Sequence, residues 1–239
     1  MKTIFKREFL SYFRTPVGYV FIGVFSALSS VIFYLNNIAT LSGELLIFLS
    51  QLTLLVMLLS PLLTMRLLSE DSQEHTGKLL LSSPVPLPAI VLGKYLAAAA
   101  VLLIAITLTN VSTAIIAIYG TAYAGEWFVG YLGFTLQALS FLALDMFLTC
   151  FGRNQMSAAL LAFAGNLVLW TLDLLSDAIP VPFISKTLAF LSLYNRYEPF
   201  ILGQLSFASL AFFLAFIALF MIATMRLLDA RRFSQGGAA

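Results

Sequence analysis

The chain has few charged residues. Only 10% of its 239 residues are Asp, Glu, Lys or Arg, whereas 61% are hydrophobic, and a water-soluble domain carries about 25% charged residues. No soluble fold can bury that much apolar surface, so the composition predicts a protein whose solvent is a lipid bilayer. The length leaves room for about six spans of roughly 20 residues with short connections, and for no large soluble catalytic domain.

Cysteine and histidine are also scarce. Cys150 is the single cysteine and His75 the single histidine, which excludes an internal disulfide, a cysteine-based metal site and a histidine cluster. The Gly-Lys pairs at 77–78 and 93–94 lack the second glycine and the following Ser or Thr of a phosphate-binding loop. We therefore expect no catalytic residue, metal or cofactor in this chain and no nucleic-acid partner. If ATP drives the protein, another chain binds it.

Long apolar runs dominate what is present. Backbone polar groups must be paired internally in lipid, and the runs lack the roughly ten-residue alternation of a membrane barrel, so we expect an all-α membrane protein. The first run is expected to stay as a span, because no small-residue cleavage site follows it. The six expected spans, within one membrane domain, are about 17–36, 45–66, 90–119, 129–150, 156–176 and 205–228.

Residues 2–14 precede the first span and show an amphipathic pattern, with apolar residues such as Ile4, Phe5 and Phe9 near helical spacing. This pattern predicts a helix that lies in the headgroup region, with its basic side toward the lipid phosphates. The alternative is a plain cationic tail. The basic side chains of the segment are Lys2, Lys6, Arg7 and Arg14.

Lys and Arg are distributed unevenly between the expected connections. With the amino terminus in the cytoplasm, the inner side holds 11 of the 13 basic residues, and the outer side holds only Lys186 and Arg196. This bias predicts that both termini are cytoplasmic, which requires an even number of spans. The inner basic residues are Lys2, Lys6, Arg7, Arg14, Arg66, Lys78, Lys94, Arg153, Arg226, Arg231 and Arg232.

The last outer connection is too interrupted for a clean span and too apolar for a free loop. Over about 179–204 we expect two short helices that dip into the outer leaflet and are split near Tyr194–Asn195. A seventh span is the alternative, but it would move the basic carboxyl terminus outside.

A charged, proline-rich segment, residues 66–94, separates the second and third apolar runs. Ser69 is placed to cap a helix over about 69–83, with Glu70 and Asp71 in its first turn, where acidic groups favour the helix dipole. Such a helix at the cytoplasmic surface would present acidic groups to a groove on a soluble partner. The alternative is a solvated inner loop with ordinary caps.

The order of residues in this segment resembles the signature of type-2 ABC exporter permeases. A cluster of acidic and basic residues at 69–78 is followed by a Leu-Leu pair, by Pro84 and by the closing pair at 93–94. Thr76-Gly77 stands where many members have Gly-Thr. Residues 151–155, and residues 193–200 before the last span, are also similar to this family, most closely to its gliding-motility-type branch.

The resemblance implies a function and a set of partners. It implies six spans, an interfacial amino-terminal helix, a cytoplasmic coupling helix and two short outer helices, in a prokaryotic inner membrane. Two permease chains, identical or different, would sit on two ATP-binding subunits that bind ATP and magnesium, with an accessory outer-side protein as a further partner. The residues that would transmit ATPase closure to the spans are Glu70, Asp71, Glu74, His75, Gly77 and Lys78.

Four polar residues inside the expected spans are candidates for a transport pathway: Asp145, Asn110, Gln137 and Asn166. An ionised carboxylate in mid-bilayer costs roughly 2.5–3.5 kcal/mol on insertion scales. Asp145 is therefore expected to face the bundle interior, a cavity or the inner headgroup zone near Arg153. It is either a substrate or proton site, or a partly solvated or protonated residue near the cytoplasmic rim, and we favour the second. The three amides would line a pathway or hydrogen-bond one helix to another.

The leading hypothesis is the permease subunit of an ATP-driven exporter, or of a related device that transmits force across the membrane. An ion- or proton-coupled transporter usually carries several intramembrane charges, and Asp145 alone is thin support. A non-transporting membrane anchor for a cytoplasmic complex fits the 66–94 segment as well. An intramembrane enzyme is not expected, because His75 lies in an inner loop and Asp145 has no acidic partner within the spans.

Overall fold

The structure is a computed structural model, and it describes residues 1–73, 86–119, 123–178 and 192–236. Within these ranges every regular element is a helix and no β-strand is present, which confirms the all-α class. In chain order the elements are α1 (Lys2–Arg14), α2 (Pro16–Phe33), the π-helix η1 (Tyr34–Ile38), α3 (Leu45–Gln73), α5 (Leu87–Leu108), α6 (Asn110–Tyr119), α7 (Ala124–Thr149), α8 (Gln155–Ala178), α10 (Leu193–Ile201) and α11 (Phe207–Gly236).

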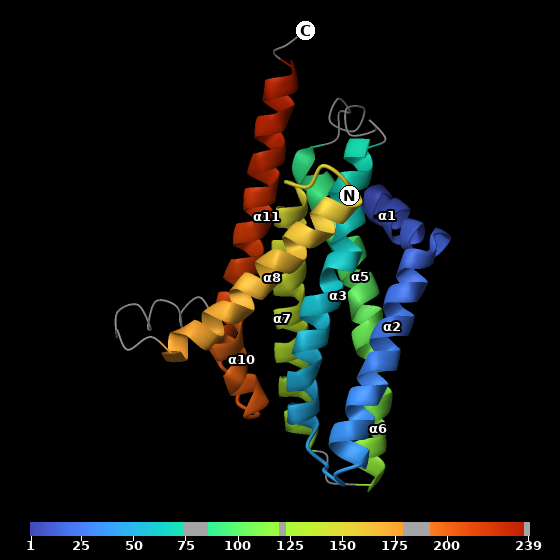
Figure 1. Cartoon of the computed structure of the whole chain (residues 1–239), viewed down its shortest axis with the longest axis vertical. Coiled ribbons are helices and arrows are strands. Elements are labelled where there is room, and N and C mark those ends of the chain that lie inside the picture. Colours follow the sequence, from blue (N-terminus) through green and yellow to red (C-terminus); the bar gives the residue numbers. More distant parts are fainter. Residues whose placement is uncertain (74–85, 120–122, 179–191, 237–239) are drawn as a thin grey trace.

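Five helical segments of the described chain are long and apolar enough to cross a membrane, which makes this a multi-pass membrane protein. They are Pro16–Ile38, Leu45–Leu67, Leu87–Ile118, Ala124–Thr149 and Phe207–Ala230. α8 differs from them, because its apolar stretch among the described side chains is the shorter Gln155–Thr171 and because it runs obliquely across the bundle (Figure 1). A sixth crossing by α8 stays a prediction.

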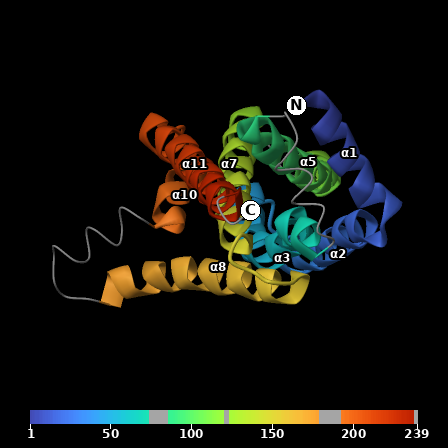
Figure 2. The same ribbon diagram turned by 90° about the horizontal axis from the view of Figure 1, so that it is seen from above.

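α7 lies in the middle of the bundle and packs against α3, α5, α8, α10 and α11. Seen from above, α11 lies on one side of α7 and α5 on the other, while α8 lies across α3 (Figure 2). Two glycines of α7 permit this close packing. A Cβ atom on Gly133 would lie 2.4 Å from Phe200 Cγ of α10, and one on Gly130 would lie 2.7 Å from Leu46 Cδ2 of α3.

α1 is a helix over the predicted range. Phe5, Phe9 and Phe13 are partly buried against the core and form a row of ring contacts, with centroid distances of 5.8 and 5.1 Å. The basic side chains of this helix are exposed; they are Lys2, Lys6, Arg7 and Arg14. The helix is therefore amphipathic in the structure, while its position at a membrane surface stays a prediction.

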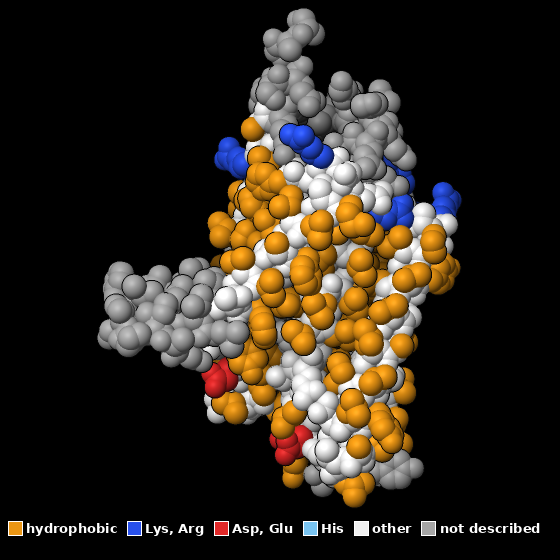
Figure 3. Space-filling model, in the orientation of Figure 1, with side chains coloured by type: hydrophobic (Ala, Val, Ile, Leu, Met, Phe, Trp, Pro, Cys, Tyr) orange, Lys and Arg blue, Asp and Glu red, His pale blue; other side chains and the backbone are white. Residues whose placement is uncertain are grey.

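Charged side chains gather at the two ends of the bundle. On the face shown in Figure 3, Lys and Arg side chains lie at the end that carries α1, and acidic side chains lie toward the opposite end. We call the first the basic end, which includes Arg14 and Arg66, and the second the acidic end, which includes Glu44 and Glu126 at the starts of α3 and α7. Between the ends the surface is largely apolar (Figure 3).

α3 is longer than the apolar run that predicted it. It continues without a break through Ser69 to Gln73, so the predicted helix start at Ser69 is wrong. No proline or glycine follows Pro61 in this helix, and Leu63 and Leu67 are buried against the core, so nothing ends the helix at Ser69. Residues 74–83 of the predicted coupling helix, and residues 179–191 of the predicted outer helices, lie outside the described residues.

The third apolar run, expected as one span over 90–119, is one segment of membrane-crossing length, Leu87–Ile118, but its helix is interrupted at Thr109 between α5 and α6. The Thr109 hydroxyl donates to Ile106 O at 2.7 Å and lies 3.0 Å from the Tyr131 hydroxyl of α7. These polar contacts stabilise the break, and Tyr131 lies too far along the sequence to have been predicted as their partner.

α10 passes unbroken through Tyr194 and Asn195, where a split between two short helices was predicted. The helix instead begins at Leu193, because the Ser192 side chain accepts a hydrogen bond from Asn195 N at 2.9 Å and caps its first turn.

Candidate functional site

Pro61 lies inside α3 and leaves a carbonyl group of that helix without its usual donor. Proline has no backbone N–H, so Met57 O, four residues earlier, cannot complete its hydrogen bond within the helix. Asn166 of α8 supplies a donor instead, because its Nδ2 donates to Met57 O at 3.1 Å. This bond joins α8 to α3 at the point where the two helices cross.

Ser60 and Asp145 extend this contact to α7. Ser60 Oγ donates to Asp145 Oδ2 at 2.5 Å, and Asn166 Nδ2 lies 3.4 Å from Ser60 Oγ. All three residues are fully buried, and we call them the polar cluster. Asp145 Oδ1 and Asn166 Oδ1 have no hydrogen-bond partner among the described residues, so the polar cluster has spare acceptors in the middle of an apolar bundle.

Asp145 is buried in the interior of the bundle, which is one of the positions that the sequence suggested. It is 0% exposed, and within the described part of the chain no ion pair joins it to Arg153 or to any other residue. A partly solvated Asp145 is therefore wrong, whereas a protonated Asp145 stays a prediction. A carboxyl group in such surroundings is stable only when it is neutral or when its charge is balanced by a bound group, which gives Asp145 the chemistry of a proton or cation site.

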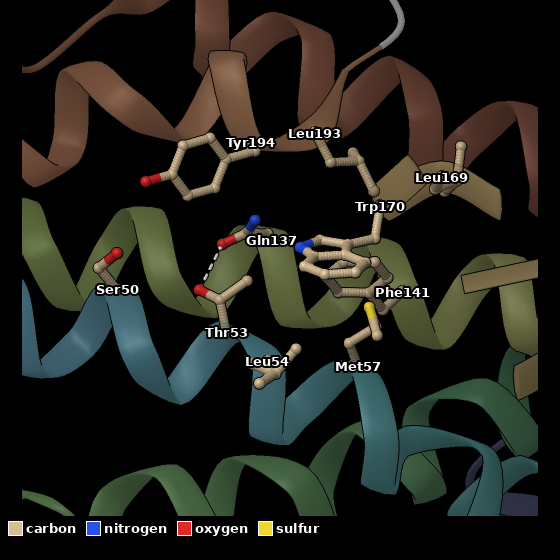
Figure 4. Close-up of a pocket in the computed structure, with 10 residues that line it drawn as sticks. All are labelled: Ser50, Thr53, Leu54, Met57, Gln137, Phe141, Leu169, Trp170, Leu193 and Tyr194. Atoms are coloured by element: carbon tan, nitrogen blue, oxygen red, sulfur yellow. Dashed lines mark hydrogen bonds between the residues drawn. The ribbon is translucent and has the colours of Figure 1, made fainter. Parts of the chain in front are cut away.

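A small cavity lies next to the polar cluster, between α3, α7, α8 and α10 (Figure 4). On its wall Thr53 Oγ1 donates to Gln137 Oε1 at 3.0 Å, and the rings of Trp170 and Tyr194 also line it. Its volume is about 80 Å³, whereas pockets for drug-sized ligands measure roughly 300–1,000 Å³. A larger substrate would not fit in this cavity without space contributed by a second chain or by another conformation.

Asn110, the fourth predicted polar residue, lies apart from the other three. It begins α6, where Trp127 Nε1 of α7 donates to its Oδ1 at 2.9 Å and its own Nδ2 donates to Thr107 O at 3.1 Å. The first bond connects α6 to α7, and the second connects α6 to the end of α5. The structure thus brings Asp145, Gln137 and Asn166 against α3, and leaves Asn110 outside that group.

At the basic end a buried lysine ties α5 to α3 and α1. Lys94 is 2% exposed, its Nζ donates to Leu67 O at 2.6 Å, and the same atom lies 3.5 Å from Glu8 Oε1. Arg7 also contacts Glu8 Oε1, at 2.7 Å. A buried ammonium group is stable only when it is paired and hydrogen-bonded, and the partners of Lys94 come from two other helices.

Further contacts fix α1 to the same place. The Tyr12 hydroxyl donates to Leu63 O at 2.5 Å, and Arg66 Nη1 donates to Thr15 Oγ1 at 2.5 Å. We call these contacts, together with the Lys94–Glu8 pair, the α1 latch. The α1 latch holds α1 against α3 and α5, the two helices on either side of residues 74–85.

Some of the residues predicted to couple to an ATPase lie in α3, close in sequence to the α1 latch. The others lie outside the residues that the structure describes. Glu70 and Asp71 lie in the last turns of α3. The remainder lie outside the described residues: Glu74, His75, Gly77 and Lys78. Sequence reasoning did not single out the α1 latch, although one signal was present, since a lysine close to the start of an apolar run needs an acidic or carbonyl partner.

No protein-family model matches this chain, and no curated protein matches it either. What the fold and the two polar regions define is a class: a multi-pass helical membrane protein with a buried polar cluster within its bundle and an amphipathic helix latched to its basic end.

Proposed function

We propose that this chain is the membrane subunit of an ATP-driven exporter, and that a separate subunit binds ATP and magnesium. The permease-like order of residues in the 66–94 segment and the lack of a phosphate-binding loop support this proposal. If this proposal is correct, the basic end faces the cytoplasm of a prokaryotic cell. α8 is then the fifth of six spans, and the segment around α10 lies in the outer leaflet.

The observation that carries the proposal is the α1 latch. A membrane subunit that is driven by a separate ATPase subunit must receive force at one surface. It must transmit this force to its spans without local deformation of the helices at that surface. Lys94, Glu8 and Tyr12 connect α1, α3 and α5 by buried polar contacts, and α3 and α5 flank the charged segment predicted to dock on the ATPase. Displacement of that segment would therefore move three helices together.

A paired permease is the second part of the proposal. The cavity beside α3 and α8 is about 80 Å³, too small for a transported molecule of ordinary size. A second copy, or a similar chain, would complete the pathway. The output would be export of a substrate, or force transmitted to another membrane protein.

Charge reversal by Glu70→Lys with Glu74→Lys tests the docking segment. The tagged chain, purified gently from its native membrane, is expected to bring an ATP-binding subunit in equal amount, and the double variant is expected to lower the associated ATPase activity by about tenfold, since coupling energies are of order 1–3 kcal/mol. The matched control is Glu44→Lys with Glu126→Lys at the acidic end, which should leave the activity unchanged. A folded Glu70→Lys, Glu74→Lys variant with normal ATPase activity would count against docking here.

A proton-coupled transporter is the second candidate, and the buried Asp145 favours it. The two proposed functions predict different results for liposomes that contain this chain alone and enclose a pH-sensitive dye. The exporter proposal expects no proton flux under a pH gradient, and expects Asp145→Asn to leave the ATPase of the complex within about twofold. A flux that Asp145→Asn abolishes would replace the exporter with the proton-coupled transporter.

A further inference from the structure

Gln137 of α7 has a hydrogen-bond donor that the described part of the protein does not use. The residue is 1% exposed, and its Oε1 accepts a hydrogen bond from Thr53 Oγ1 at 3.0 Å. Its Nε2 has no acceptor among the described residues, yet this atom is not sealed inside the bundle as Asp145 Oδ1 is. A bound molecule can therefore reach the donor.

The donor faces the cavity between α3, α7, α8 and α10. Gln137 lines that cavity, and Figure 4 shows its nitrogen on the side away from Thr53, toward the ring of Tyr194. Polar side-chain atoms in protein interiors are usually paired, because an unpaired donor costs free energy. We therefore expect the occupant of the cavity to bring an acceptor to Gln137 Nε2.

The described wall of the cavity carries no charged side chain. The lining side chains with polar atoms are Ser50, Thr53, Gln137, Trp170 and Tyr194. A charged group that moves into such a space loses its hydration and gains no counter-charge. Carboxylates, phosphates and ammonium groups are therefore poor occupants, whereas an uncharged acceptor such as a carbonyl oxygen is compatible with this wall.

Water alone fits the cavity poorly. One water needs about 10–15 Å³ and two to four polar partners, so the cavity volume of about 80 Å³ corresponds to several waters. Half of the lining side chains are apolar and offer them no good partner; they are Leu54, Met57, Phe141, Leu169 and Leu193. A carbonyl group needs only one donor and places its own carbon atoms against such side chains.

The size and the opening of the cavity indicate how the occupant is built. Leu54, Trp170 and Tyr194 line the cavity and are 43–47% exposed, so it opens at the surface of the bundle. Leu54 belongs to the membrane-crossing segment Leu45–Leu67, so this surface is reached from lipid. The cavity is smaller than the roughly 150 Å³ that holds benzene. A small polar group can enter, while an attached apolar tail stays in the lipid.

We infer that this cavity binds the uncharged carbonyl group of a lipid-soluble amphipathic molecule, such as a ketone, an ester or an amide. The carbonyl oxygen accepts a hydrogen bond from Gln137 Nε2, and the neighbouring carbon atoms lie against Phe141 and Trp170. The role of this molecule as an exported substrate rests on the proposed function, whereas the binding itself requires no ATPase.

The test compares the binding of dodecan-2-one and of 2-methyl-1-dodecene, in which a methylene group replaces the carbonyl oxygen, to the purified full chain in lipid nanodiscs. Binding is followed by the fluorescence of Trp170, which is the single tryptophan in a Trp127→Phe background, and concentrations are referred to the lipid phase. The ketone is expected to bind about tenfold more tightly, because only it pairs the Gln137 donor. Ionised undecanoate, which has the same tail, should bind about tenfold more weakly than the ketone.

Gln137→Met should reduce the preference for the ketone to less than about twofold, because methionine has a similar length and no N–H. The matched control is Gln51→Met, since Gln51 lies on α3 but pairs with Asn36 and does not line the cavity. This control should keep the preference of about tenfold. If Gln137→Met does not fold, Ser50→Phe fills the cavity from α3 and should lower the ketone affinity about tenfold.

Equal affinity for the ketone and the alkene would overturn the inference, and so would undecanoate that binds as tightly as the ketone. A preference that survives in folded Gln137→Met, or ketone binding that survives in folded Ser50→Phe, would place the molecule elsewhere and overturn it as well. These results would leave the proposed export function standing, since that function rests on the α1 latch and the 66–94 segment. Conversely, a chain that purifies without an ATP-binding subunit would contradict the export function and leave this binding site in place.

Discussion

Replacing Lys94 by methionine is expected to lower the free energy of unfolding by about 3 kcal/mol. Removing one member of a buried ion pair leaves the other charge uncompensated, at a cost of about 3–5 kcal/mol, and the lower figure applies because Glu8 is also contacted by Arg7. Methionine keeps most of the side-chain volume, so the loss reports on the ammonium group. The measurement is unfolding of the purified chain in mixed detergent micelles.

Two variants separate the Lys94 pair from a general effect of charge. Arg226→Met removes an exposed cation from the same half of the bundle and should change stability by less than about 0.5 kcal/mol. The double variant Glu8→Gln, Lys94→Met should be no less stable than the single variant Lys94→Met, because it no longer contains the Glu8 carboxylate that would lack its lysine partner. If Lys94→Met leaves the free energy of unfolding unchanged, the α1 latch does not hold α1 in place.

The second large effect is expected at Asn166. Asn166→Leu should destabilise the protein by about 2 kcal/mol, because Met57 O then has no donor within the membrane. The physical cause is Pro61, whose missing N–H leaves that carbonyl open. The same variant should loosen α8, which is measurable as faster hydrogen exchange along Gln155–Thr171.

A double-mutant cycle tests that cause directly. In a Pro61→Ala background the helix supplies its own N–H to Met57 O, so Asn166→Leu should cost about 1 kcal/mol less than it does beside Pro61. The control pair is Asn110→Leu with and without Pro61→Ala, for which no coupling is expected, because Asn110 contacts Trp127 and Thr107 rather than α3. An equal cost of Asn166→Leu in both backgrounds would contradict the proposed link between Pro61 and Asn166.

Local signals predicted the helices better than their ends. Residues 2–14 were predicted as a helix and form α1 over Lys2–Arg14, and the run expected at 129–150 lies within α7 except for its last residue, Cys150, which follows the end of the helix. Ser69 had the sequence of a helix cap, yet α3 continues through it. A cap is a preference of about 1 kcal/mol, and the buried Leu63 and Leu67 outweigh it by keeping the preceding turns packed.

The candidate site was only partly predictable. Asp145, Gln137 and Asn166 stood out because polar groups are rare in apolar runs. Their partners did not, since Asn166 and Met57 O lie 109 residues apart, and Ser60 and Asp145 lie 85 apart. The coupling residues from Glu74 to Lys78 lie outside the described residues, so their role stays a prediction.

Composition and order along the chain determined that this is a helical membrane protein, which segments are apolar, and that its charges divide into a basic and an acidic end, because hydropathy and charge are properties of the local sequence. Only the tertiary structure decided that Lys94 is buried against Glu8, that Asn166 donates to the carbonyl group that Pro61 leaves without a donor, and that Asn37 Oδ1 is buried without a hydrogen-bond partner among the described residues. Those outcomes depend on the tilt and rotation of each helix, which are set by close packing such as that of Gly133 against Phe200.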